Sequence, residues 1–135
     1  MSLRILFVII LYSIWQVPHL WLIRLVNRRD YFSSTSPFTL NSLTPEQLQR
    51  LIPLWVAVFA ILALFLRRFD FIKNSTSSLL LLVISIMLPI IFYFSLKRSC
   101  EEKKCRALFL LLNLSAFGIT VLSGIDSIKG FTVMK

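Results

Sequence analysis

Acidic residues are scarce in this sequence, and none of them lies inside a long apolar stretch. The 135 residues include six Asp and Glu, against fifteen Lys and Arg and a single His. The acidic residues lie in loops or at the ends of apolar stretches, and they are Asp30, Glu46, Asp70, Glu101, Glu102 and Asp126. Proton-coupled transport usually needs an ionisable group inside the bilayer. This distribution of carboxylates therefore argues against a proton-coupled transporter.

The signature motifs of enzymes and metal sites are also missing. The sequence contains no Gly-rich phosphate loop, no serine nucleophile elbow, no paired carboxylates and no internal repeat. Cys100 and Cys105 have no second Cys or His pair beside them to complete the four ligands of structural zinc. His19 alone cannot supply two axial imidazoles to a haem. We therefore expect no enzymatic activity, no bound metal and no cofactor.

Four charge-free apolar stretches dominate what is present. They cover residues 5–23, 51–66, 79–96 and 107–125 of a chain that is 57% hydrophobic. A helix rises about 1.5 Å per residue and a bilayer core is about 30 Å thick, so a span needs roughly 17 to 25 apolar residues. The pattern predicts an all-α integral membrane four-helix bundle, antiparallel and up-down with short loops, as a single domain over residues 1–135. The expected spans cover residues 4–26, 48–67, 77–96 and 106–125, with a first loop over residues 27–47.

The second of these helices carries a start signal. Its elements are an N-cap, a proline at the first helical position, an acidic residue in the first turn and a capping-box glutamine. They are supplied by Thr44, Pro45, Glu46 and Gln47. The sequence therefore predicts that this helix begins at Pro45, before the apolar stretch enters the membrane.

The net charge of +9 is carried by residues beside or between the apolar stretches. Lys and Arg in such positions set topology and meet anionic lipid, so the expected partner is the lipid bilayer and not nucleic acid. Nine of the fifteen basic residues flank the first and third loops, which favours cytoplasmic loops and both termini outside. In that topology Cys100 and Cys105 are free thiols, whereas an external third loop would permit a disulfide. A bacterial inner membrane is the favoured location, with a mitochondrial or endoplasmic reticulum membrane as the alternative.

The fourth apolar stretch carries small and polar residues on one helical stripe. The stripe recurs at i, i+3, i+7 and i+11 and consists of Asn113, Ala116, Thr120 and Gly124. A second surface of small residues lies in the second stretch and consists of Ala57, Ala60 and Ala63. Helices in a bilayer associate through close packing over small residues and through interhelical hydrogen bonds. Either the two surfaces pack on each other within this chain, or one of them receives a helix of another protein.

The first apolar stretch contains a polar face. Tyr12, Gln16 and His19 recur at i, i+4 and i+7, so they share one side of the expected helix. This face has two interpretations. It lines a binding site or a channel, or it hydrogen-bonds to Ser85 or Asn113 and locks the bundle.

These features favour a small, non-catalytic multi-pass membrane protein that acts by helix packing with another integral membrane protein. Such a protein would be an accessory subunit of a membrane complex, or a protective protein of the immunity or exclusion kind. The alternative is a small channel or transporter lined by Tyr12, Gln16 and His19. A membrane enzyme or redox subunit that uses His19 is the third hypothesis.

Overall fold

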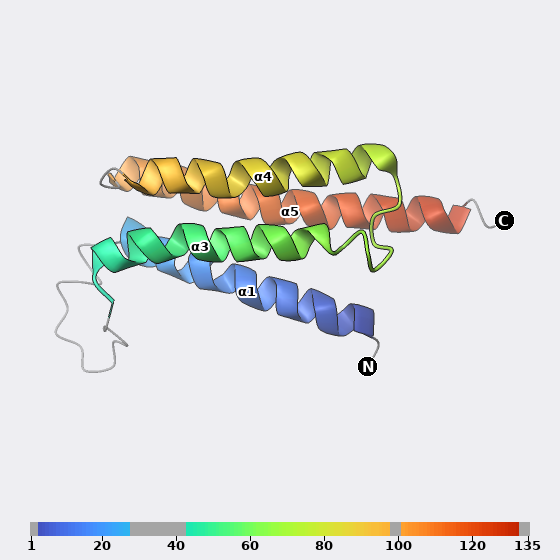
Figure 1. Ribbon diagram of the computed structural model, residues 1–135, viewed down its shortest axis with the longest axis horizontal. Helices are drawn as coiled ribbons and strands as arrows, with labels where there is room; N and C mark the ends of the chain where they lie inside the picture. The colour runs from blue at the N-terminus through green and yellow to red at the C-terminus, as the bar shows by residue number, and fades with distance from the viewer. Residues whose placement is uncertain (1–2, 28–42, 98–100, 133–135) are drawn as a thin grey trace.

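The computed structural model describes residues 3–27, 43–97 and 101–132, and these residues form four long helices. The helices are α1 (Leu3–Val26), α3 (Pro45–Leu64), α4 (Ser75–Lys97) and α5 (Glu102–Thr132). Successive helices run in opposite directions along one long axis (Figure 1). No strand occurs within the described residues. The prediction of an all-α, antiparallel four-helix bundle is therefore confirmed.

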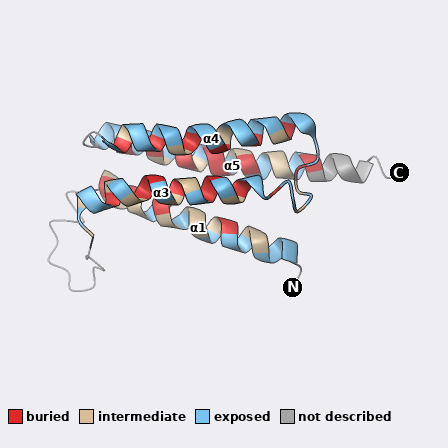
Figure 2. Ribbon diagram, in the orientation of Figure 1, coloured by how far each residue is buried: buried red, intermediate tan, exposed pale blue. Residues whose placement is uncertain are grey.

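All four helices are long and apolar enough to cross a membrane. The shortest candidate span has 20 residues, which corresponds to about 30 Å at 1.5 Å per residue. Large apolar side chains cover the outside, and Leu79, Phe94, Leu114 and Phe117 are each 63% to 67% exposed. Buried positions recur along the inner sides of the helices, as Figure 2 shows. Because soluble monomers rarely expose apolar surface on this scale, we conclude that this is an integral multi-pass membrane protein.

The helices form a ring in which each one contacts two neighbours. Helix α3 packs against α1 and α4, and α5 also packs against α1 and α4. Helices α3 and α5 therefore lie across the bundle from each other. The core receives side chains from all four helices, and the most buried include Leu11, Leu22, Phe59, Phe92 and Leu112, each at most 1% exposed. Dispersion contacts between such side chains hold the ring together, since lipid provides little hydrophobic drive for helix association.

The start of α3 follows the signal in the sequence. The Gln47 backbone N–H donates to Thr44 Oγ1 at 3.3 Å, and the Thr44 backbone N–H donates to Gln47 Oε1 at 2.8 Å. This reciprocal capping box satisfies two otherwise unpaired donors at the helix terminus. The predicted start at Pro45 is confirmed.

Other helix boundaries differ from the expected spans: α4 begins at Ser75 instead of residue 77, α5 begins at Glu102 instead of residue 106, and two helix ends are also displaced. Helix α3 ends at Leu64 rather than at residue 67, and a turn over residues 65–70 follows it. This turn includes Asp70 in the left-handed region, with φ at 61°. Helix α5 continues to Thr132, past the expected end at residue 125. Hydropathy shows where a chain is apolar enough to span a membrane. It does not show that a turn interrupts an apolar run, as after Leu64, or that a helix continues past one, as after residue 125.

Candidate functional site

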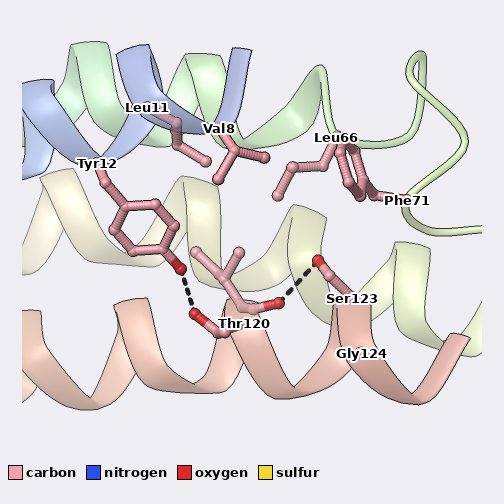
Figure 3. Close-up of a pocket in the computed structure, with 9 residues that line it drawn as sticks. Val8, Leu11, Tyr12, Leu66, Phe71, Thr120, Ser123 and Gly124 are labelled. Carbon is pink, nitrogen blue, oxygen red and sulfur yellow. Dashed lines mark hydrogen bonds between the residues drawn. The ribbon is translucent and has the colours of Figure 1, made fainter. Parts of the chain in front are cut away.

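A lateral cleft of about 260 Å³ lies between α1 and α5. Figure 3 shows its side chains, which come from α1, from the segment between α3 and α4, and from α5. They are Val8, Leu11, Tyr12, Leu66, Phe71, Ile119, Thr120, Ser123 and Gly124. Most of these side chains are apolar. The cleft therefore suits an apolar side chain or a lipid chain rather than a charged ligand.

A hydrogen bond between Tyr12 and Thr120 crosses this α1–α5 seam (Figure 3). Thr120 Oγ1 donates to the Ala116 carbonyl oxygen of its own helix at 2.8 Å. Because a threonine hydroxyl has one hydrogen, the Tyr12 hydroxyl is the donor in the bond to Thr120. Ser123 Oγ likewise donates within α5, to the Ile119 carbonyl oxygen at 2.9 Å. The hydroxyl groups around the cleft therefore already have protein partners.

The predicted stripe on α5 contacts the bundle at one end and is open at the other. Ala116 is 5% exposed, whereas Thr120 and Gly124 are exposed. A Cβ atom added at Gly124 would meet no atom within 4 Å, so no neighbouring helix uses the missing side chain. Asn113 is half-buried, and its Nδ2 donates to the Phe109 carbonyl oxygen of the same helix at 2.8 Å. The stripe thus packs near Ala116 and presents a free surface near Gly124.

The three alanines of the second predicted surface lie on α3. Ala60 and Ala63 are at most 3% exposed, and Ala57 is half-buried. The helices that cover α3 are α1 and α4, and α5 lies on the opposite side of the ring. The structure therefore does not bring the α3 alanines and the α5 stripe together as one helix pair.

The three polar residues of α1 have different surroundings. Tyr12 lines the cleft, Gln16 is exposed and His19 is half-buried. The His19 ring lies beside the rings of Trp15 and Phe109, with centroid distances of 4.6 Å and 4.9 Å. Among the described residues, His19 Nδ1 and Trp15 Nε1 are buried without a hydrogen-bond partner. These surroundings identify His19 as part of an aromatic contact between α1 and α5.

The hydrogen-bond partner of this polar face is not one of the two residues expected. Tyr12 bonds to Thr120, whereas Asn113 donates within α5. The Ser85 hydroxyl is buried and has no partner among the described residues. The face is therefore connected to α5 through Tyr12.

Asp126 is an important polar residue that the sequence did not single out. Asp126 is 4% exposed. Its Oδ2 accepts from the backbone N–H groups of Lys73 and Asn74, each at 3.0 Å. Its Oδ1 accepts from Ser77 Oγ at 3.1 Å. A carboxylate from α5 thus holds the two residues directly before α4, close to a helix terminus that favours negative charge. The N-cap of α4 itself is Asn74, whose Oδ1 accepts from the Thr76 backbone N–H at 3.3 Å. We call the three contacts of the Asp126 carboxylate the Asp126 cap. The polar run before α4 signals a helix start, but it does not reveal that a distant acid binds there.

The favoured prediction of free thiols is wrong. Cys105 is 1% exposed and disulfide-bonded, not a free thiol. The other cysteine of the chain, Cys100, lies outside the described residues. Among the residues that are described, no group of three or more His, Cys, Asp or Glu is placed to hold a metal ion.

Comparison with known proteins gives a local similarity. No protein-family model matches the chain, and no solved structure matches it significantly. The chain is similar to the protoheme IX farnesyltransferases of Nitratidesulfovibrio vulgaris strains DP4 and Hildenborough, with 33% identity over 64 and 63 residues. Each similarity covers 47% of this chain and 22% of the relative, so the chain spans about a fifth of the length of these proteins.

Proposed function

We propose that this protein is a non-catalytic membrane protein that packs a helix of another integral membrane protein against its α1–α5 seam. The observation that carries the proposal is the open position at Gly124, next to the apolar cleft of about 260 Å³. Membrane helices approach each other closely over small residues, because no side chain then separates the backbones. An accessory subunit of a membrane complex or a protective protein of the immunity kind would act in this way.

The cleft and the glycine complement each other as a helix-binding surface. Gly124 allows a partner backbone to approach α5, and the cleft beside it provides space for large apolar side chains of that partner. Thr120 and Ser123 line the same surface but donate within α5. Association would therefore depend on packing, which is the main source of helix affinity in lipid.

Two glycine substitutions test this proposal with a matched control. Gly124→Leu fills the open surface, and Gly118→Leu makes the same change on the same helix, six residues away and about 120° around the helix. Neither glycine has an atom within 4 Å of an added Cβ, so both variants should fold. The tagged variants are purified from native membranes in mild detergent, and bound membrane proteins are quantified by mass spectrometry. We expect Gly124→Leu to lose a partner that Gly118→Leu retains.

Equal partner recovery with both variants would refute the proposed surface. A crosslinker placed at Thr120 tests the surface in native membranes, without detergent. Equal crosslinking of the partner in both variants would also refute the proposed surface. Loss of the partner with both variants would show that the loss is not specific to the Gly124 face, which also contradicts the proposal.

A second candidate function is the binding of an isoprenoid chain. The local similarity to protoheme IX farnesyltransferases and the apolar walls of the cleft favour it. A photoreactive farnesyl probe should then label residues of the cleft, such as Val8 and Leu11, and excess farnesol should compete while a fatty acid should not. Labelling spread evenly over the outside of the helices would indicate lipid-like partitioning and would remove this candidate.

A further inference from the structure

A second cleft, of about 440 Å³, lies between the beginning of α3 and the end of α4. Its residues differ in character from those of the α1–α5 cleft, because charged, polar and apolar side chains all line it. They are Glu46, Gln49, Arg50 and Pro53 of α3 and Tyr93, Leu96 and Lys97 of α4. These two helices pack side by side, and the two helix ends lie at the same end of the bundle (Figure 1).

The cleft carries a net positive charge. Arg50 and Lys97 contribute two positive charges and Glu46 one negative charge, so the lining has a formal net charge of 2 − 1 = +1. Neither Arg50 nor Lys97 forms an ion pair within the described residues. The Lys97 ammonium instead lies 5.7 Å from the centroid of the Tyr93 ring. The two cations are thus available to a ligand at the mouth of the cleft.

The position of the cations along the helices matches the boundary of the hydrocarbon. Arg50 directly precedes the apolar stretch of α3, and Lys97 directly follows the apolar stretch of α4. Pro53 and Leu96 are buried and lie on the membrane side of these cations. The cleft therefore has a basic mouth at headgroup depth and apolar walls directed toward the membrane interior.

We propose that this α3–α4 cleft binds an anionic phospholipid. Its phosphate lies between the Arg50 guanidinium and the Lys97 ammonium, with the Gln49 amide as a further donor, and an acyl chain follows Pro53 and Leu96. Arginine suits this role because its planar fork matches phosphate oxygens. A headgroup with one net negative charge balances the net charge of the lining, which a zwitterionic headgroup does not.

Native mass spectrometry of the purified protein tests the site. The full chain in mild detergent is titrated with phosphatidylglycerol or with phosphatidylcholine of the same acyl chains, and bound lipid is counted. The double variant Arg50→Gln/Lys97→Gln removes both cations. Arg68→Gln/Lys73→Gln removes the same charge at exposed positions at the other end of the bundle. We expect the first variant to weaken phosphatidylglycerol binding about tenfold or more and the second to leave it nearly unchanged.

Two further variants separate loss of the site from loss of the fold. Arg50→Lys/Lys97→Arg keeps both charges and should retain binding within about threefold. Gln49→Glu lowers the formal net charge of the lining from +1 to 0 and should weaken binding several-fold while leaving the helices intact. Binding that is unaffected by Gln49→Glu and by Arg50→Gln/Lys97→Gln would overturn the proposal.

The remaining outcomes distinguish a bound phospholipid from unspecific electrostatic attraction and from free phosphate. Equal losses in the Arg50/Lys97 and Arg68/Lys73 variants would show unspecific electrostatic attraction and would contradict a built site. Excess inorganic phosphate, at constant ionic strength, should not displace phosphatidylglycerol, because the acyl chain contributes to binding. Complete displacement would show that the cleft binds free phosphate, and the lipid assignment would be wrong.

Discussion

The α3–α4 seam and the α1–α5 seam pack in different ways. The contact between α3 and α4 is the most extensive in the bundle, and Phe59, Ala63 and Phe92 on these helices are at most 1% exposed. The α1–α5 seam has the Tyr12 hydrogen bond to Thr120 and opens into a cleft beside it. Close packing thus closes the first seam except for the charged cleft at one end of the two helices, whereas the second seam opens laterally within its apolar stretches. We therefore expect the α3–α4 pair to provide most of the stability, and the α1–α5 seam to provide an apolar surface at membrane depth.

Helix α5 is joined to the beginning of α4 by a polar contact near the end of its candidate span. Asp126 accepts from the backbone N–H groups of Lys73 and Asn74, directly before α4. Helix α5 also packs against α1 and α4, but its surface at Gly124 is open. These contacts hold α5 in the bundle while the surface at Gly124 stays open.

The largest effect is expected from removing the Asp126 cap. Asp126→Ala leaves two backbone N–H groups and the Ser77 hydroxyl without their buried acceptor, and we expect the free energy of unfolding to fall by about 3 kcal/mol. Equilibrium unfolding in mixed micelles, followed by tryptophan fluorescence, measures this change. If this cap holds α5 in place, α5 should detach first during unfolding of the Asp126→Ala variant, while α3 and α4 remain packed together.

The control for this prediction is an exposed ion pair at the same end of the bundle. Arg4 and Asp70 lie 3.3 Å apart, but their side chains are 60% and 61% exposed. Because solvent screens such pairs, Arg4→Ala should change the free energy of unfolding by less than about 1 kcal/mol. A loss from Asp126→Ala as small as that from Arg4→Ala would contradict the assigned role of the cap.

A buried position on α3 and the open position on α5 should respond oppositely to the same kind of enlargement. Ala63 is fully buried on α3, so Ala63→Leu should overpack its surroundings and lower the free energy of unfolding by about 2 kcal/mol. Gly124→Leu meets open space and replaces a poor helix former, so it should be neutral or slightly stabilising. Unfolding curves of the two variants measure the difference. Equal destabilisation would show that the surface at Gly124 is closed.

The disulfide at Cys105 should contribute an amount similar to or smaller than the packing of Ala63. The two cysteines of the chain are at positions 100 and 105, and cross-linking so short a loop stabilises by about 2 kcal/mol. A maleimide reagent should label the unfolded protein only after reduction, and reduction should lower the unfolding midpoint. Labelling of the unreduced, unfolded protein would show that Cys105 is not disulfide-bonded.

A disulfide also bears on topology. Disulfides persist in oxidising compartments, so we expect the end of the bundle with Cys105 to face outward, opposite to the topology favoured by the basic residues. A membrane-impermeant reductant should then reduce the disulfide in intact cells. After the reductant is removed and the protein is denatured, a maleimide should label Cys105. Reduction only after the cells are opened would restore the original topology.

The sequence predicts the helices well because each one depends on local information. A span is determined by its own apolar length in a bilayer, and the capping box at Thr44 and Gln47 is formed by residues three positions apart. The early end of α3 at Leu64 was not predictable from hydropathy, because Phe65 and Leu66 continue the apolar run into the turn.

The candidate site is less predictable because it depends on which helices meet. Small residues occur on both α3 and α5, and nothing in their spacing shows that the two helices lie across the ring from each other. The spacing of Gly124 predicts a close approach, yet only the arrangement of α1 and α5 leaves it open. The same holds for Asp126, whose partners precede it by about fifty residues in the chain.

The smallest expected effect tests the hydrogen bond that crosses the open seam. Tyr12→Phe removes the donor to Thr120, and interhelical hydrogen bonds in membranes contribute about 0.6 kcal/mol on average. Thr120→Val and the double variant complete a cycle that isolates this coupling from changes in packing. A coupling near this value would mean that packing holds the α1–α5 seam together and that a partner helix can enter the cleft at little cost. A coupling above about 1.5 kcal/mol, near the upper limit for such bonds, would instead make the Tyr12–Thr120 bond the lock of the seam, and a partner could then bind only beside it, at Gly124.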